Sequence, residues 1–255
     1  MKGRVSEQDI AGSSACFPVV GFLEGLLLAA LSSGLLKLLS PSVTSALVII
    51  IYLVINGGFH QDGLSDTFDA LSVKSTGNPG QDRQKRLAIM RDSTSGPVGI
   101  TAIAIFLLLK YTLLKEILEM PAYGLSPAIV LMPMISAWSM TMMMPGAKSA
   151  RDDGLGKIFL GRIHAGHILL TCILLTVLSG AIYLVSHGPR LLTMLTFMPF
   201  FAIAAIVSLA AAYAMRLIFT ARFGGLTGDN LGCIHEISEI VSLLAAVLFY
   251  NYKCF

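Results

Sequence analysis

Seven apolar runs, most of them about as long as a membrane is thick, constrain the fold of this chain more than any other feature. A helix needs about 20 apolar residues to cross a hydrocarbon core about 30 Å thick. The runs lie at residues 17–40, 42–58, 97–119, 125–145, 166–186, 191–215 and 236–250. The last run is the shortest and contains Glu236 and Glu239, so the sequence predicts six or seven transmembrane helices.

The composition favours one membrane domain. Of 255 residues, 55% are hydrophobic and 13% are charged, which is far from the usage of soluble proteins. We find no low-complexity tract, no short-period repeat and no appended soluble domain. The apolar run that begins at residue 17 is too long for the core of a signal peptide, so we interpret it as a retained anchor. The fold class expected for residues 1–255 is therefore all-α, as a single polytopic membrane domain.

Charged residues are concentrated between alternate runs. Thirteen of the 18 basic residues fall in segments 1–16, 59–96, 146–165 and 216–235, which the positive-inside rule assigns to the cytoplasm. All nine aspartates fall in the same segments, although acidic residues contribute little to orientation. A shared polar chemistry on the cytoplasmic face is the simplest reason. We therefore expect the active-site segments to be 57–96 and 222–240.

The stretch GGFHQDGLSDTFDAL, residues 57–71, is the first candidate site. If it is helical and continues from the preceding run, Asp62, Asp66 and Asp69 stand at i, i+4 and i+7 and share one face over two turns. Three like charges so close repel each other and need arginine, lysine or a divalent cation nearby. Oxygen ligands alone suit a hard cation such as Mg²⁺, Mn²⁺ or Ca²⁺, and Mg²⁺ typically binds substrate phosphates as well.

These aspartates predict pyrophosphate or phosphoryl chemistry at a membrane surface. A solvated end of a juxtamembrane helix is the simpler alternative. Gly57, Gly58 and Gly63 would let backbone or ligand approach closely, although Gly57 and Gly58 would equally suit a kink where the run ends. His60 fits a general base, a phosphate-binding group or an interface residue. The four cysteines lack C-x-x-C spacing, so no disulfide and no thiolate metal site is expected.

The segment KRLAIMRDSTSGPVGI, residues 85–100, supplies a second set of candidates. Arg86 and Arg91 offer forked donors to a pyrophosphate, and the Ser93 hydroxyl stands just before the third apolar run. We assign these three residues to substrate binding and add Asp92 to the catalytic candidates. Positive-inside anchoring is the alternative for the basic residues, and it accounts less well for the sequence MRDS.

The segment RFGGLTGDNLGCIHEISEI, residues 222–240, supplies a third set. Its glycines make a flexible turn, and Thr227 or Asp229 would cap the last helix. Ionisable groups this close to an apolar run are functional candidates by default. We assign Thr227, Asp229, Asn230 and Glu236 to substrate binding, since capping alone would account for only one of the first two.

Four segments, in this order and spacing, resemble the adenosylcobinamide-GDP ribazoletransferase, or cobalamin synthase, family: 17–29, 57–71, 86–100 and 222–244. The elements H-x-D-G-L-x-D and G-G-L-T-G-D are fairly specific, and the resemblance covers almost the whole chain. The departures are Glu24, where the family usually has an aliphatic residue, Ala70, where glycine is frequent, and the loop PGAKSARDDGLGK, which varies. In that loop we expect Asp152 and Asp153 to be solvated. No acidic residue of the motifs is missing.

The resemblance implies a Mg²⁺-dependent transferase of substituted phosphate groups that acts late in cobalamin biosynthesis. It would join adenosylcobinamide-GDP to the ribose hydroxyl of α-ribazole, or of α-ribazole 5′-phosphate, and release GMP. The three aspartates of 57–71 would bind the metal, directly or through water. Asp92 and Asp229 would bind metal or orient a hydroxyl, the two arginines would hold the diphosphate, and His60 would act as a base or assist the leaving group.

Two other functions were weighed against this one. A CDP-alcohol phosphotransferase also places aspartates around a D-G step, but DGLSDTFDAL lacks the A-R pair of that class. A cation-coupled transporter would place carboxylates near the middle of the membrane and show an inverted repeat. The expected location is the cell membrane, multi-pass, with the active site facing the cytoplasm. The expected partners are the two substrates and the lipid bilayer, without nucleic acid; a homo-oligomer or association with other cobamide-assembly enzymes is compatible with the sequence.

Overall fold

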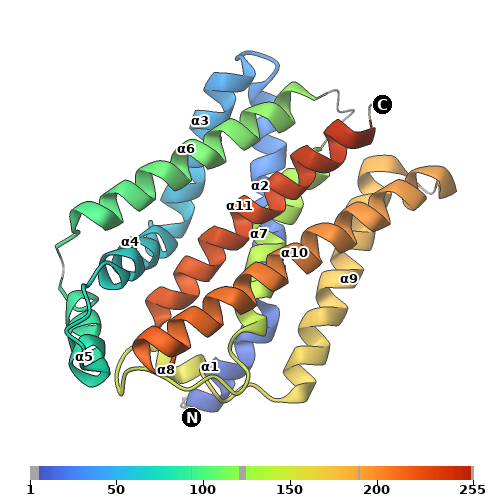
Figure 1. Cartoon of the computed structure of the whole chain (residues 1–255). Coiled ribbons are helices and arrows are strands. Elements are labelled where there is room, and N and C mark those ends of the chain that lie inside the picture. The colour runs from blue at the N-terminus through green and yellow to red at the C-terminus, as the bar shows by residue number, and fades with distance from the viewer. Residues whose placement is uncertain (1–5, 93, 121–124, 189, 254–255) are drawn as a thin grey trace, which may run out of the picture.

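The computed structural model describes residues 6–92, 94–120, 125–188 and 190–253 and shows a bundle of helices (Figure 1). Within these residues the extended structure is limited to one isolated β-bridge, between Ser149 and Leu226. The expected all-α fold class is therefore confirmed. The elements are α1 (Glu7–Ser13), the 3-10 helix η1 (Ser14–Cys16), α2 (Phe17–Leu35), α3 (Pro41–Asn56), α4 (Phe59–Leu71), α5 (Pro79–Ile89), α6 (Pro97–Glu119), α7 (Pro127–Met142), α8 (Leu155–Phe159), α9 (Ala165–His187), α10 (Leu191–Phe223) and α11 (Gly228–Lys253).

Each predicted run corresponds to one long helix, but fewer of these helices qualify as membrane spans. By length and composition, five described segments do so: Glu7–Leu35, Pro97–Glu119, Ala165–Ser186, Thr193–Phe223 and Gly228–Asn251. Helices α3 and α4 give a sixth only if they are taken as one broken span, and α7 has only 16 residues. The structure thus supports five or six spans, which includes the lower of the two predicted numbers. The seventh is missing because α7 is shorter than the run that predicted it. The last run becomes a full span because its helix begins at Gly228.

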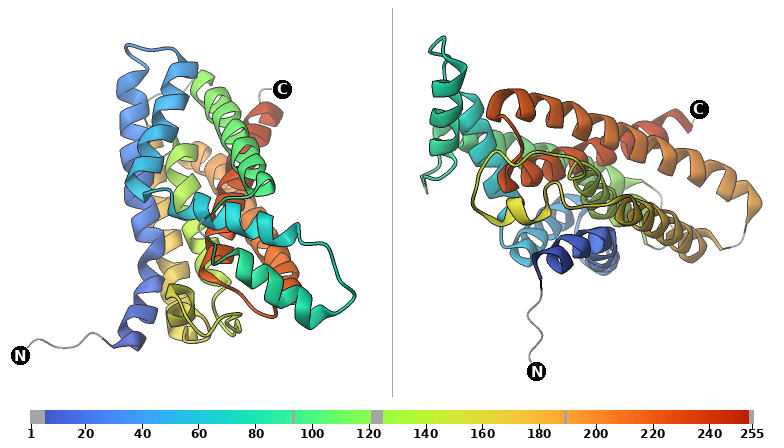
Figure 2. Two further views of the ribbon diagram at one scale, coloured as in Figure 1. Left: turned by 90° about the vertical axis from the view of Figure 1, so that its left-hand side faces the viewer. Right: turned by 90° about the horizontal axis from the view of Figure 1, so that it is seen from below.

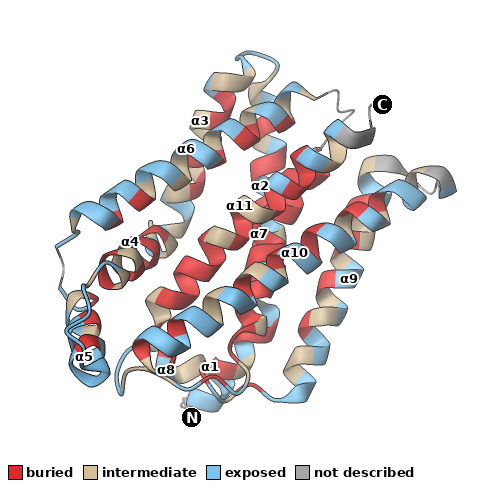
Figure 3. Cartoon of the chain, viewed as in Figure 1, coloured by how far each residue is buried: buried red, intermediate tan, exposed pale blue. Residues whose placement is uncertain are grey.

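Helix α7 occupies the centre of the bundle, where every residue from Pro127 to Thr141 is buried (Figure 3). Helix α2 approaches it closely because Gly21 and Gly25 have no side chains. A Cβ atom at Gly21 would overlap the carbonyl oxygen of Pro133, and one at Gly25 would overlap that of Val130. Small residues four apart allow this kind of close helix contact in membranes.

The chain bends by 89° between α3 and α4. Gly57 ends α3 with φ 59° and Gly58 begins α4 with φ 68°, in the left-handed region that glycine adopts without strain. Of the two roles considered for these glycines, the kink is the one that the structure shows, and the stretch after them is helical as expected. It does not continue from the preceding run, however, because the two left-handed residues turn it aside. Helix α4 therefore lies across the end of α3, and it is not one of the five candidate spans.

The connections of the bundle differ between its two ends (Figures 1 and 2). Helices α1, α4, α5 and α8 and the turn from α10 to α11 lie at one end, with the described N-terminus. The short link from α2 to α3, the end of α9 and the start of α10 lie at the opposite end, with the last turns of α11. The described parts of the four charged segments therefore share one end, as their composition predicts, and we call it the charged end.

Candidate active site

The three aspartates of α4 become steadily more buried along the helix. Asp62 is exposed, Asp66 is half-buried and the Asp69 side chain is buried. The Asp69 carboxylate accepts hydrogen bonds from the amides of Gly96, at 2.7 Å, and Gly99, at 2.8 Å. It thereby satisfies the free amides at the start of α6 and complements the helix dipole. A Cβ at either glycine would collide with this carboxylate.

Asp229 lies beside α4 because Gly63 leaves room for the first turn of α11. A Cβ atom at Gly63 would lie 2.7 Å from the carbonyl oxygen of Asp229. One turn further along α11, a Cβ at Gly232 would lie 3.3 Å from the Cα of His60. The glycine of the D-G step therefore sets the contact between α4 and α11. We call Asp62, Asp66 and Asp229 the acidic cluster.

The acidic cluster carries more negative charge than its surroundings balance. Burial, followed by the charges of Asp62 and Asp229, raises the pKa of the Asp66 carboxyl to about 7, while Arg151 opposes this shift. Arg151 Nη1 lies 3.2 Å from Asp229 Oδ2. That oxygen and the Nε and Nη2 atoms of Arg151 are buried and have no hydrogen-bond partner among the described residues. A water, an ion or a ligand would satisfy the unused hydrogen-bonding capacity of these buried atoms.

Sequence reasoning missed Arg151 as a site residue, because the positive-inside rule accounts for any basic residue in its segment. Backbone hydrogen bonds hold its loop against the turn before α11: Ala150 donates to Leu226 at 2.8 Å, and Leu226 donates to Lys148 at 2.8 Å. A Cβ at Gly225 would overlap the carbonyl oxygen of Lys148. In the sequence, only the glycine pair before Leu-Thr-Gly-Asp indicated that another segment of the chain packs closely against this turn.

The candidates near α5 and α6 are placed at different depths. Arg86 is buried and donates to the carbonyl oxygen of Arg222 at 3.4 Å, leaving its Nε without a described partner. Arg91 is exposed and forms an ion pair with Asp153 at 3.0 Å. Asp92 is also exposed and accepts a hydrogen bond from the Thr94 amide. Ser93 lies outside the described residues.

Thr227 and Asn230 form the cap of α11. The Thr227 hydroxyl accepts from the Asn230 amide, and the Asn230 side chain accepts from the Thr227 amide, both at 3.1 Å. Asn230 also donates to the Thr67 hydroxyl at 3.1 Å, which ties the cap to α4. Both cap residues are buried. Of the two predicted capping residues, Thr227 is the one that caps the helix, which leaves the Asp229 carboxylate beside α4.

Glu236 belongs to a buried ionic network that the sequence did not reveal. Lys110 is 1% exposed, and its Nζ lies 2.9 Å from Glu236 Oε2 and 2.5 Å from Glu239 Oε2. Gln61 donates to the other Glu236 oxygen at 2.8 Å, and the Tyr52 hydroxyl donates to Glu239. Protein groups therefore contact both oxygens of Glu236. A lysine inside an apolar run gave no sign of its partners, which come from α11.

His60 stacks on His235, with 3.9 Å between ring centroids. Ligand atoms of His60, His235 and Glu236 lie within 4.8 Å of one another, the only such group of three found in the described part of the chain. The Lys110 ammonium already supplies positive charge to Glu236, so this group is a poor cation site. The aspartates of α4 are spread more widely, which suits a metal that keeps several waters and binds few carboxylates.

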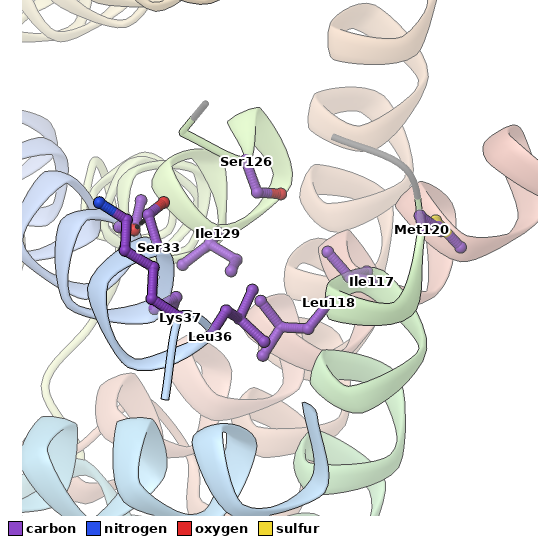
Figure 4. A pocket seen from close by; sticks show the side chains of 10 residues that line it. Ser33, Leu36, Lys37, Ile117, Leu118, Met120, Ser126 and Ile129 are labelled. Carbon is purple, nitrogen blue, oxygen red and sulfur yellow. Dashed lines mark hydrogen bonds between the residues drawn. The ribbon is translucent and has the colours of Figure 1, made fainter. Parts of the chain in front are cut away.

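Two cavities lie near the ends of the bundle. One of about 170 Å³ adjoins His60 and the first turn of α11 at the charged end. Another of about 450 Å³ lies between α2, α6 and α7 at the opposite end (Figure 4). Its wall includes Lys37, Ile117 and Ser126. Only the smaller cavity is close to the acidic cluster.

The bundle and its acidic cluster define a polytopic membrane protein with a carboxylate-rich site at one end. The sequence pattern of the CobS family, described as cobalamin-5-phosphate synthase, matches residues 1–247. The chain belongs to this family. The match covers the acidic cluster and all seven long apolar helices, apart from the last turns of α11.

Curated relatives agree along most of the chain. A protein of Thermodesulfovibrio yellowstonii named adenosylcobinamide-GDP ribazoletransferase is 32% identical over 244 residues, which is 96% of this chain and 89% of the relative. Proteins with the same name from Pseudomonas fluorescens and Clostridium botulinum strain Langeland are 32% and 33% identical, over 97% and 91% of this chain and 93% and 84% of their own lengths. No solved structure matches the fold.

Proposed function

We propose that this protein joins adenosylcobinamide-GDP and α-ribazole, or α-ribazole 5′-phosphate, and releases GMP. The observation that carries the proposal is the family match over residues 1–247, in which a carboxylate cluster stands at one end of the bundle. The ribose hydroxyl attacks the phosphorus that bears the cobinamide group. The bond from this phosphorus to the GMP oxygen breaks, and GMP leaves with that oxygen.

We propose Mg²⁺ as the cofactor, held by the acidic cluster. The residues fit such an ion because their ligand atoms are all oxygens, because Asp229 Oδ2 accepts no hydrogen bond from the described residues, and because burial and then repulsion from Asp62 and Asp229 raise the pKa of Asp66. When bound, the ion would neutralise charge on the diphosphate. Asp69 anchors α6 in this scheme, since backbone amides contact both of its oxygens.

The chain's own residues supply the remaining functions. Arg151 uses its two unpartnered N–H groups to bind a diphosphate oxygen, with Arg91 as a second donor at the rim. His60, half-buried beside the smaller cavity, accepts the proton of the ribose hydroxyl and passes it to solvent. Because the reaction is a displacement at phosphorus, the gain comes mainly from positioning two large substrates and from balancing charge.

We also propose that the protein resides in the cytoplasmic membrane with its charged end in the cytoplasm. The excess of lysine and arginine at that end supports this orientation. Substrates made in the cytoplasm would then reach the acidic cluster directly.

The test is GMP release by the purified protein in liposomes, given adenosylcobinamide-GDP, α-ribazole and Mg²⁺. GMP and a complete cobamide should appear together, and both should disappear with EDTA or with Asp62→Asn. Asp152→Asn is the matched control, because Asp152 is exposed at the same end and outside the acidic cluster. Full activity of Asp62→Asn would exclude the assigned site, and absence of product from folded wild-type protein would exclude the reaction.

A further inference from the structure

Aromatic and sulfur-bearing side chains line the 170 Å³ cavity beside the acidic cluster. The rings come from four residues on α2, α4 and α8, and the sulfur atoms from one residue of α7 and one just after it: Phe17, Phe59, His60, Phe159, Met140 and Met144. Phe17 and Phe159 meet edge to face, with 5.6 Å between centroids. Ring edges, ring faces and thioethers are favourable partners for a flat aromatic ligand.

Leu231 and three glycines form the remaining wall. Gly156, Gly228 and Gly232 line the cavity, and a Cβ at Gly156 would lie 2.5 Å from the amide nitrogen of Gly228. A side chain at Gly156 would push α8 away from the start of α11, and one at Gly232 would press against His60 of α4. These glycines therefore let α8 and α4 approach α11 closely on either side of the cavity.

The cavity adjoins the acidic cluster through the chain itself. His60 and Gly232, which line it, meet where α4 packs on α11, and one helical turn away along the same contact Gly63 meets Asp229. A nucleoside whose base occupied the cavity would place its ribose next to these carboxylates. The volume is below the range of about 300–1,000 Å³ for pockets that enclose a drug-sized ligand, so a fused bicyclic base fits and a corrin ring does not.

We propose that this cavity binds the benzimidazole base of α-ribazole, an inference that rests on the proposed function. The guanine of the other substrate carries several donors and acceptors, and the mainly hydrophobic side chains of this cavity offer it few partners. The alkylated benzimidazole of α-ribazole exposes two methyl groups and one ring nitrogen, which match this lining. The acidic cluster then receives the ribose hydroxyl, and His60 lies between the base and the reacting oxygen.

Steady-state kinetics of Phe159→Ala test the proposal. The KM for α-ribazole should rise about tenfold, the size expected for losing one aromatic stacking partner, while the KM for adenosylcobinamide-GDP stays within about twofold. Phe159→Trp keeps a ring and should restore the KM, whereas Phe159→Leu should not. Phe201→Ala is the matched control, since Phe201 is a half-buried ring of α10 in the main core.

Direct binding separates this proposal from the proposed function. Free 5,6-dimethylbenzimidazole should bind wild-type protein in liposomes without the second substrate, and Phe159→Ala should weaken binding about tenfold. Suppose instead that a folded Phe159→Ala variant releases GMP at the wild-type rate with an unchanged KM for α-ribazole. This result would overturn the proposal that the cavity binds the base, and it would leave the proposed reaction intact. If the base bound but no GMP were released, the proposed reaction would be rejected and the base-binding cavity would be kept. If phospholipid displaced the base and Phe159→Ala did not weaken base binding, the cavity would be assigned to a lipid acyl chain. That result would overturn the proposal.

Discussion

Asp69 accepts two backbone hydrogen bonds from α6, whereas Asp62 is exposed at the edge of the acidic cluster. Replacing each with asparagine should therefore change different properties. Asp69→Asn puts an amide group against a backbone N–H and should lower the free energy of unfolding by about 1–3 kcal/mol. Asp62→Asn should abolish GMP release and leave the thermal unfolding temperature close to that of wild type. Thermal unfolding and GMP release of both variants would check this, and the opposite pattern would exchange the two roles.

Arg151 offers two unpartnered N–H groups beside the acidic cluster, and lysine cannot reproduce that fork. Arg151→Lys keeps the charge next to Asp229 but should lower kcat/KM for adenosylcobinamide-GDP about tenfold or more, because a hydrogen bond to a charged group contributes about 1.5–3 kcal/mol. Arg162→Lys is the matched control, since Arg162 pairs with Glu7 away from the cluster. Equal loss of activity in both variants would remove Arg151 from the diphosphate site.

Site residues whose role depends on local spacing could be predicted from the sequence. Site residues whose role depends on a partner far away in the chain could not. The helical aspartate stretch, the kink at Gly57 and Gly58 and the Thr227 cap follow from short patterns. Arg151 does not, because its environment forms only when its loop docks on Leu226 and Asp229, 75 or more residues away in sequence. Asp69 was grouped with the other two aspartates because no local pattern shows that it faces the start of α6.

Helices α3, α4, α6 and α11 meet at the buried network around Lys110. Lys110→Met would leave the carboxylates of Glu236 and Glu239 without their cation and should destabilise the protein by about 3–5 kcal/mol. A triple variant that adds Glu236→Gln and Glu239→Gln should recover much of this loss, because no unpaired charge remains buried. Lys115→Met, at an exposed ion pair, should change stability by about 0–1 kcal/mol. Unfolding of detergent-solubilised variants measures all three, and a stable Lys110→Met would contradict the network.

Helix α5 is fastened to the preceding loop by Asp82, which accepts hydrogen bonds from the Ser75 hydroxyl and from the amide and hydroxyl of Thr76. These bonds lower the pKa of Asp82 from 3.8 to about 2. Because the folded-state pKa is the lower one, the carboxylate stabilises the folded protein above about pH 4, and this contribution is lost as the pH falls toward 2. The unfolding temperature of wild type should exceed that of Asp82→Asn by a constant amount above pH 4 and converge with it below, whereas a constant difference down to pH 2 would contradict the assignment.

On the scale of the whole molecule, the segregation of charge between the two ends was readable from the sequence, because helices that alternate in direction place every second connection at the same end. The number of spans was readable only in part, because the structure supports five or six but not seven. A 16-residue helix is about 24 Å long, less than a hydrocarbon core of about 30 Å, yet α7 is buried among other helices and does not need to match the lipid. Hydropathy alone cannot separate a short central helix from a span that contacts lipid.

The opposite ends of the bundle should lie on opposite sides of the membrane, and cysteine labelling tests which end is cytoplasmic. In a variant whose four cysteines are replaced by alanine, Gln84→Cys marks α5 at the charged end and Leu38→Cys marks the link after α2, where Leu38 is 85% exposed. The positive-inside bias predicts that a membrane-impermeant maleimide labels Leu38→Cys in intact spheroplasts and labels Gln84→Cys only after the membrane is opened. Labelling of Gln84→Cys from outside would reverse the proposed orientation and separate the acidic cluster from cytoplasmic substrates. Labelling of both from one side would show that α2 and α3 do not place these positions across the membrane from each other.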